Sequence, residues 1–269
     1  MIRNALASIM IALLPTMAHA ETVNIYAAGS LKAALTEIAR AFEAQSNGAH
    51  TVATEFAASG LLRDRIEKGE PAHVFASANM EHPRSLASRG LASGTVALFA
   101  RNQLCALARS GLAVTTDTLL DVMLAAGTRL GTSTPKADPA GDYAYAMFEM
   151  AEKLRPGARA TLEAKAQQLT GGPTSPKAPD GRNLYAWVMD TDKADVFLTY
   201  CTNAVLARKQ LPDLKIVEVP RSLAVGADYG MIVLKDAPAA ASALAAFIGG
   251  ATGQAILAKY GFGRGDSAN

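Results

Sequence analysis

Two short β-like runs each lead directly into a helical stretch through a serine. The first junction reads Ala27-Ala28-Gly29-Ser30-Leu31 and the second reads Ala57-Ala58-Ser59-Gly60-Leu61. A helix that begins in this way has backbone N–H groups without intrahelical partners, and the serine hydroxyl adds another donor. We therefore expect the two junctions to face one cleft and to present their donors to a small anion.

A serine at the start of a helix also has a purely structural interpretation. Its hydroxyl commonly caps the first turn, and for either serine taken alone this role is the more frequent one. Gly29 and Gly60 lie beside Ser30 and Ser59 and let the backbone approach a ligand closely. The paired arrangement therefore favours binding over simple capping.

Strand-like and helix-like segments alternate along the chain. The first strands are expected at residues 22–26, 51–56 and 74–78, and a helical pattern follows each of the first two. The pattern restarts beyond residue 100, and final strands are expected at residues 215–219 and 229–234. This rhythm predicts an α/β fold with mostly parallel sheets covered by helices on both faces, and a chain that leaves one lobe and returns to it.

The N-terminus has the pattern of an export signal. Arg3 provides a positive charge, residues 5–14 are apolar except for Ser8, and Ala18-His19-Ala20 has the small-x-small pattern of a cleavage site. We predict cleavage after Ala20, which makes residues 1–20 a signal peptide and the mature protein periplasmic. A membrane anchor is the competing interpretation, but the apolar run is shorter than the roughly 20 residues that span a bilayer.

Charge and cysteine content limit the partners and the chemistry. The chain has 26 basic and 24 acidic side chains, and such a balance argues against a nucleic-acid partner. The two cysteines, Cys105 and Cys201, lie in or beside β-like runs. In an oxidising compartment they form either one disulfide or two buried thiols, and the sequence leaves both alternatives open.

Several motifs occur in an order that resembles the periplasmic molybdate-binding proteins of ABC importers. They span nearly the whole mature chain, and they are the two serine junctions, Pro71-Ala72-His73-Val74-Phe75-Ala76-Ser77-Ala78, Asp138-Pro139-Ala140-Gly141, and the ending Gly253-Gln254-Ala255-Ile256-Leu257-Ala258-Lys259-Tyr260-Gly261-Phe262. The resemblance implies a type II periplasmic binding protein with two α/β lobes, joined by two crossover segments and closing over one oxyanion. One lobe would comprise residues 21–101 and 213–269, and the other residues 102–212. The partner would be an ABC permease, and the protein a monomer without a cofactor.

The resemblance also implies a set of ligand-binding residues. The serines at the first two helix starts, an amide in the Pro-Ala-Gly turn, a further amide and a tyrosine hydroxyl correspond here to Ser30, Ser59, Ala140, Arg182 and Tyr200. These groups would hold molybdate or tungstate through its oxygens, with no direct bond from the protein to the metal. A site made only of donors would also reject a protonated anion, because its O–H group would find no acceptor.

Two other interpretations stay open. Arg182 replaces a residue that normally offers only its backbone amide; pointing inward, it would suit a carboxylate or another oxyanion equally well, and pointing outward it would be an ordinary surface residue. An exported hydrolase that uses Ser30 or Ser59 as nucleophile would need His50 as its base, because His50 is the histidine nearest to them in the sequence. We expect no catalytic residues, since neither a nucleophile elbow nor a P-loop motif occurs.

Overall fold

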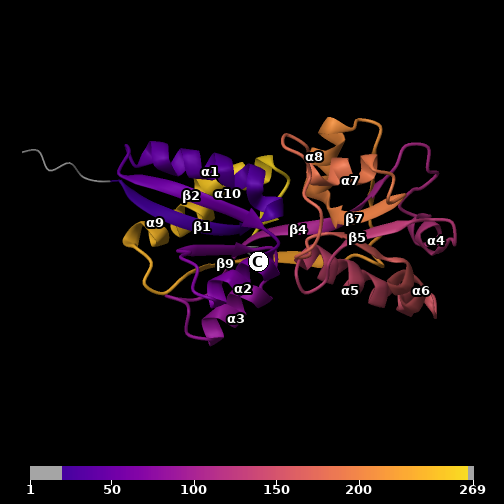
Figure 1. Cartoon of the computed structure of the whole chain (residues 1–269), viewed down its shortest axis with the longest axis horizontal. Helices are drawn as coiled ribbons and strands as arrows, with labels where there is room; N and C mark the ends of the chain where they lie inside the picture. Colours follow the sequence, from indigo (N-terminus) through magenta and orange to yellow (C-terminus); the bar gives the residue numbers. More distant parts are fainter. Residues whose placement is uncertain (1–19, 266–269) are drawn as a thin grey trace, which may run out of the picture.

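The structure is a computed structural model that describes residues 20–265. The export signal predicted at residues 1–20 therefore lies outside the described residues, apart from Ala20 at its end. The protein has two halves that lie side by side along its long axis, and each half contains a β-sheet flanked by helices (Figure 1). The two-lobed α/β architecture expected from the sequence is confirmed.

The first half is built around the N-terminal strands. Their order in the sheet is β2-β1-β3-β9, and β1 pairs in parallel with both β2 and β3. The strands are β1 (Glu21–Ala28), β2 (His50–Ala57), β3 (Val74–Ser77), β9 (Gly226–Val233) and the short β10 (Gly263–Arg264). The helices of this half are α1 (Lys32–Gln45), which a 3-10 turn (Gly29–Leu31) precedes, α2 (Ser59–Glu67), α3 (Glu81–Ser88), α9 (Ala239–Gly249) and α10 (Ala251–Lys259).

The second half has a smaller sheet in which β5 pairs in parallel with β6 and β7. Its strands are β5 (Leu130–Ser133), β6 (Gln167–Thr170), β7 (Val196–Tyr200) and β8 (Lys215–Glu218). Its helices are α4 (Leu119–Leu124), α5 (Pro139–Leu154), α6 (Ala158–Lys165), α7 (Leu184–Asp190) and α8 (Cys201–Gln210).

One long strand, β4 (Ala97–Ala108), belongs to both sheets. Its first part pairs antiparallel with β9, and its second part pairs antiparallel with β7 and β8 (Figure 1). The chain passes from the first half to the second along β4 and returns between β8 and β9. Each sheet is therefore parallel where β-α units follow one another, and antiparallel where strands carry the chain between the halves.

The core contains the apolar residues that the helical spacing predicts. Leu35, Ile38 and Phe42 of α1 face inward at 6% exposure or less, and all four residues of β3 are buried. Burial of a side chain of this size stabilises the fold by about 1.5–3 kcal/mol. The amphipathic pattern of α1 thus fixes which face of the helix packs on the sheet.

Within residues 20–265 no single helix combines the length and the apolar character needed to cross a membrane. Only α9 and α10 taken together pass that test, and they are bent by 57° at the break between them. In the fold α9 packs against β1 and β9, and α10 packs against α1 and α9.

Candidate functional site

The two serine junctions lie at the same edge of the first sheet. Because β1 and β2 are parallel neighbours in register, with Ala28 opposite Ala57, both strands end together and both following helices start side by side. The carboxyl ends of parallel strands are the usual place for ligands in α/β folds. Ser30 and Ser59 are therefore brought to one edge, as the sequence predicted.

Tyr200 reaches Ser59 from the other half of the molecule, through Ala78. The hydroxyl oxygen of Ser59 accepts a hydrogen bond from the backbone N–H of Ala78 at 3.1 Å, and the Tyr200 hydroxyl donates to the carbonyl oxygen of the same residue at 3.5 Å. Ser59 and Tyr200 are both 1% exposed. The halves thus meet where two of the predicted binding residues lie.

Tyr229 joins Ser30 to the strands that connect the halves. Its hydroxyl lies 3.0 Å from Ser30 Oγ, and its ring centroid lies 5.5 Å from that of Tyr200. The Asn102 side chain on β4 donates to the Tyr229 hydroxyl at 3.3 Å and to Thr202 Oγ1 at 2.9 Å. Sequence reasoning missed Tyr229 and Asn102, because no motif marks them and they are 127 residues apart in the chain.

Gly60, at the start of α2, touches the segment that precedes α5. Its backbone N–H donates to the carbonyl oxygen of Ala137 at 2.8 Å. A Cβ atom at this position would collide with the carbonyl oxygen of Lys136 and would lie 2.7 Å from that of Ala137. The approach of the second junction to the second half therefore depends on a residue without a side chain.

The Ala140 amide lies at the start of α5, close to this contact, but it already has an acceptor. Asp138 is the N-cap of α5, and its Oδ1 accepts from the Ala140 N–H at 3.1 Å, while Pro139 occupies the first turn. Burial raises the pKa of Asp138 to about 6, although the hydrogen bond from Ala140 acts in the opposite direction. The site therefore includes a carboxyl group beside one of the predicted donors.

Within residues 20–265, Arg182 forms no hydrogen bond or ion pair with the other four predicted residues. Its guanidinium group pairs with Asp190 at 2.8 Å, and its side chain is 37% exposed. Its backbone N–H donates to the carbonyl oxygen of Pro179 at 3.0 Å in a local turn. Of the two orientations that the sequence left open, the structure has the outward one.

The hydroxyl groups of the site are uncharged at neutral pH. Burial raises the pKa of Tyr200 well above its usual value, and it also raises the pKa of Tyr229. Burial is the main cause that raises the pKa of Tyr143, which stacks edge-on against Tyr200, to about 12. Neutral phenol groups donate hydrogen bonds, so these tyrosines act as donors rather than as anions.

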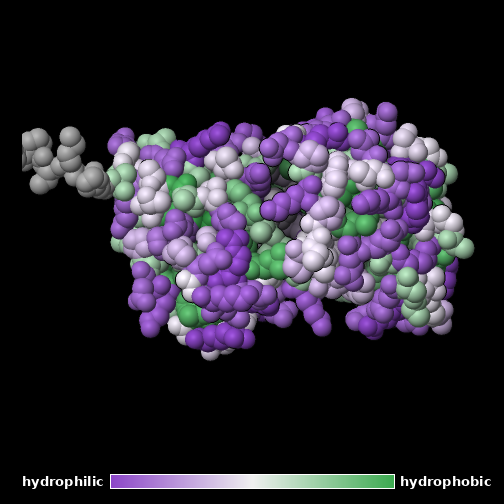
Figure 2. Space-filling model, in the orientation of Figure 1, coloured by the Kyte–Doolittle hydropathy of each residue, from purple (hydrophilic) through white to green (hydrophobic). Residues whose placement is uncertain are grey.

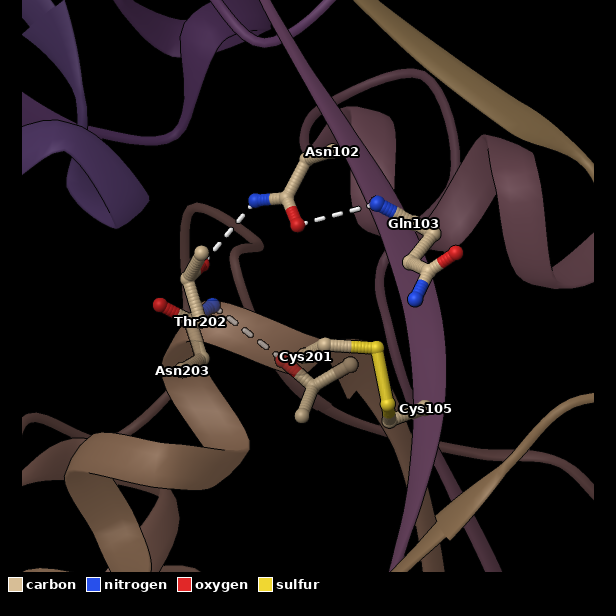
Figure 3. The surroundings of a disulfide bond; sticks show 7 residues. Asn102, Gln103, Cys105, Cys201, Thr202 and Asn203 are labelled. Atoms are coloured by element: carbon tan, nitrogen blue, oxygen red, sulfur yellow. Dashed lines mark hydrogen bonds between the residues drawn. A yellow bond between two sulfur atoms is a disulfide. The ribbon is translucent and has the colours of Figure 1, made fainter. Parts of the chain in front are cut away.

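A disulfide lies directly beside the site. Cys105 on β4 is bonded to Cys201, the first residue of α8, so the pairing that the sequence left open is a disulfide (Figure 3). Cys201 lies between Tyr200 and Thr202. The bond therefore fixes the start of α8 to the strand that joins the halves.

The structure does not place His50 near either serine. His50 is the first residue of β2 and stacks on Phe42, whereas Ser59 follows the other end of the same eight-residue strand. A strand of that length spans about 25 Å. In the described part of the chain, no three His, Cys, Asp or Glu side chains gather as metal ligands would.

The family model of the bacterial extracellular solute-binding proteins matches residues 23–263. The chain belongs to this family. A Pasteurella multocida protein, PM1146, is 39% identical over 208 residues, which cover 77% of this chain and 85% of that protein. The molybdate-binding protein ModA of Mycobacterium tuberculosis is 27% identical over 247 residues, which cover 91% and 85%.

Solved structures share the fold at low sequence identity. The sulfate-binding protein SubI of Mycobacterium tuberculosis has a TM-score of 0.75 at 17% identity, covering 92% of this chain and 88% of that one. The periplasmic molybdate-binding protein of Azotobacter vinelandii has a TM-score of 0.67 at 19% identity, covering 89% and 98%. Iron-bound HitA of Pseudomonas aeruginosa has a TM-score of 0.65 at 17% identity, covering 93% and 88%.

Family and fold together define the general role of the protein. It is a periplasmic solute-binding protein of the type that serves ABC importers, and its family is in general not enzymatic. The solutes named for its structural relatives differ from one another. The chemistry of the site residues therefore decides which solute this protein binds.

Proposed function

We propose that the protein captures a small tetrahedral oxyanion of the molybdate and tungstate type between its two halves and delivers it to an ABC permease. One observation carries this proposal: Ser30 and Ser59 start neighbouring helices at one edge of the first sheet, and Tyr200 of the other half reaches this edge through Ala78, so that uncharged hydroxyl groups of both halves lie around it. The space-filling view shows apolar atoms near the middle of one face, where the polar surfaces of the halves meet (Figure 2).

The amides at the two junctions support an anion as the ligand. Within residues 20–265, the backbone N–H groups of Ser30 and Ser59 donate to no other group of the chain. Each lies at the start of a helix, where the backbone contributes about half a positive charge. A hydrogen bond to a charged acceptor contributes about 1.5–3 kcal/mol, so several of them suffice for binding at or below micromolar concentration.

Calorimetric titration of protein that has been unfolded, freed of ligand and refolded tests the proposal. Molybdate and tungstate are expected to bind at micromolar concentration or tighter. Sulfate is expected to bind more weakly, because its S–O bonds are shorter than Mo–O and W–O bonds and its oxygens would not reach all the donors of a site wide enough for molybdate. The sulfate-binding relative makes sulfate the sharpest competitor in this comparison. Absence of heat with molybdate, tungstate, sulfate and phosphate would reject the proposal.

Substitution of the junction serines tests the site. Ser30→Ala and Ser59→Ala are each expected to weaken binding about 10-fold to 100-fold, the loss of one hydrogen bond to a charged acceptor. Ser88→Ala is a matched control, because the Ser88 hydroxyl is exposed and donates to Ser85 on α3. Thermal unfolding should accompany the titrations, since Ser59 Oγ also accepts from Ala78. Unchanged affinity in both variants would remove these serines from the site.

Substitution of Arg182 separates the oxyanion from a solute held by an ion pair. Because its guanidinium group pairs with Asp190 on the surface, Arg182→Ala is expected to change the affinity by less than about twofold, as is usual for an exposed pair. The same calorimetric titration measures the affinity of Arg182→Ala for the anions. A loss of 100-fold or so would show that Arg182 turns inward when the solute binds, and would favour a carboxylate.

A further inference from the structure

Asp138 stands where the proposed anion needs a donor. The Ala140 N–H, one of the donors that the resemblance implies, is directed at Asp138 Oδ1. An anion oxygen that approaches this N–H therefore comes into contact with the carboxyl group as well. Two ionised acceptors side by side repel each other, and neither has a hydrogen atom to offer.

Asp138 is held in this position by its neighbours. The adjacent Ala137 accepts the hydrogen bond from Gly60, so the segment lies against the other half of the molecule. Gly171 lies directly against Cβ and Oδ2 of Asp138, so a side chain at that position would collide with the carboxyl group, and this loop covers Oδ2. Asp138 nevertheless keeps some accessible surface although protein atoms surround its carboxyl group. Asp138 therefore lies beside the contact between the halves, with its carboxyl group covered by protein atoms.

We propose that Asp138 couples capture of the anion to one proton, which lies between its carboxyl group and an oxygen of the bound anion. This inference rests on the proposed function. When a fully ionised anion such as molybdate or sulfate binds, the complex takes up this proton from solution. When hydrogen phosphate binds, the anion itself supplies the proton. In both cases the repulsion between two acceptors becomes an O–H···O hydrogen bond to a charged group.

The surroundings of Asp138 favour uptake of a proton. Asp142, on the next turn of α5, adds negative charge, and Tyr185 on α7 and Tyr200 on β7 are neutral. Ser133 and the Ala140 amide are its hydrogen-bonding neighbours, and both are uncharged. In the part of the chain that the structure describes, no lysine or arginine forms an ion pair with Asp138. The pKa of Asp138 is already near 6, so a bound dianion that raises it above about 8 keeps the group protonated in the complex at neutral pH.

The coupling predicts how affinity changes with pH. Asp138 is ionised in the free protein above its pKa and protonated in the complex, so the affinity for sulfate or molybdate should fall by up to about tenfold per pH unit between about pH 6.5 and about pH 8, and should level off above the pKa that Asp138 has in the complex. Phosphate should show a shallower slope over the same range, because it carries its proton into the site. Calorimetry in two buffers of different protonation enthalpy should detect uptake of about one proton per sulfate at the upper end of this range.

Asp138→Asn tests the assignment, because asparagine keeps the acceptor for the Ala140 N–H and cannot ionise. The variant is expected to bind sulfate and molybdate with no pH slope, to take up no proton, and to bind more tightly than the native protein above about pH 8. Asp142→Asn is the matched control on the same helix and should keep the slope. A thermal unfolding curve for each variant checks that it is folded.

The outcomes separate this inference from the proposed function. If the native protein binds the anions with an affinity that does not change with pH, or if Asp138→Asn keeps the slope, the proton coupling is overturned while the oxyanion receptor stands. If neither protein binds any of these anions at any pH in the range, both are overturned. A slope that disappears only in Asp138→Asn supports the assignment.

Discussion

Addition of one methyl group at Gly60 is expected to weaken capture of the anion by about 100-fold or more and to leave the folded state nearly as stable as before. The Cβ atom would meet two backbone carbonyl oxygens, those of Lys136 and Ala137, and neither can move as a side chain would. The clash lies between α2 of the first half and the segment before α5 of the second. Each half can therefore fold normally while contact between them is prevented.

The size of the effect follows from the cost of overpacking. An extra methylene in a close contact typically costs about 1–3 kcal/mol, and the upper end of this range corresponds to more than 100-fold in affinity. Gly60 is the second residue of α2, where alanine is tolerated and even favours the helix, so the open form is not penalised. The apparent affinity is then the native affinity multiplied by the fraction of molecules in which the two halves can still close.

Titration calorimetry measures the affinity of Gly60→Ala, and small-angle scattering with and without anion shows whether the protein still becomes more compact. Gly249→Ala on α9 is the matched control away from the junctions, because outside its own helix no heavy atom would lie within 4 Å of the added Cβ. The control should bind within a few-fold of the native protein. Native affinity in Gly60→Ala would show that the contact of α2 with Ala137 plays no part in binding.

Removal of the disulfide is expected to lower the free energy of unfolding by about 3–5 kcal/mol. Cys105 and Cys201 are 96 residues apart, so the bond closes a long loop that contains most of the second half and restricts the unfolded chain strongly. In a protein of this size, such a loss lowers the midpoint of thermal unfolding by about 10 °C. Because α8 begins at Cys201, the positions of Tyr200 and Thr202 should loosen as well.

Thermal unfolding with and without a reductant tests this expectation, and the Cys105→Ala/Cys201→Ala double variant should unfold at the same temperature as the reduced native protein. The reductant should have no effect on the double variant, because this variant has no disulfide. This control shows that the reductant does not change the unfolding temperature in any other way. Equal unfolding temperatures for the oxidised and the reduced native protein, after a thiol assay confirms reduction, would contradict the expectation.

Much of the fold could be predicted from local pattern. The apolar spacing in α1 determines which face is buried, and the strand-like runs before Ser30 and Ser59 form β1 and β2. Once two parallel strands follow each other through a helix, they end at the same edge, so the convergence of the two serines needed no further information. The order of motifs resembled the periplasmic molybdate-binding proteins, and the match over residues 23–263 confirms the broader family of bacterial extracellular solute-binding proteins.

Other features of the site depend on residues that are far apart in the sequence. The sequence could not place Tyr229 beside Ser30, because these residues are 199 positions apart and meet only when β9 returns to the first sheet. It left the orientation of Arg182 open, because an arginine in a loop pairs with whichever acid the fold brings near, here Asp190. It also identified Asp138 only as a residue typical of turns and caps.

The α/β class and the two serine-led helix starts could be predicted from the sequence, because hydrophobic period, glycine placement and free helix N-termini are local properties. The bond between the two cysteines, the contact of Gly60 with Ala137 and the contact of Ser30 with Tyr229 were visible only in the folded molecule. Each of these contacts joins residues that are far apart in the chain, and its distance depends on how the strands pair and how the two halves pack. Local sequence patterns do not predict that distance.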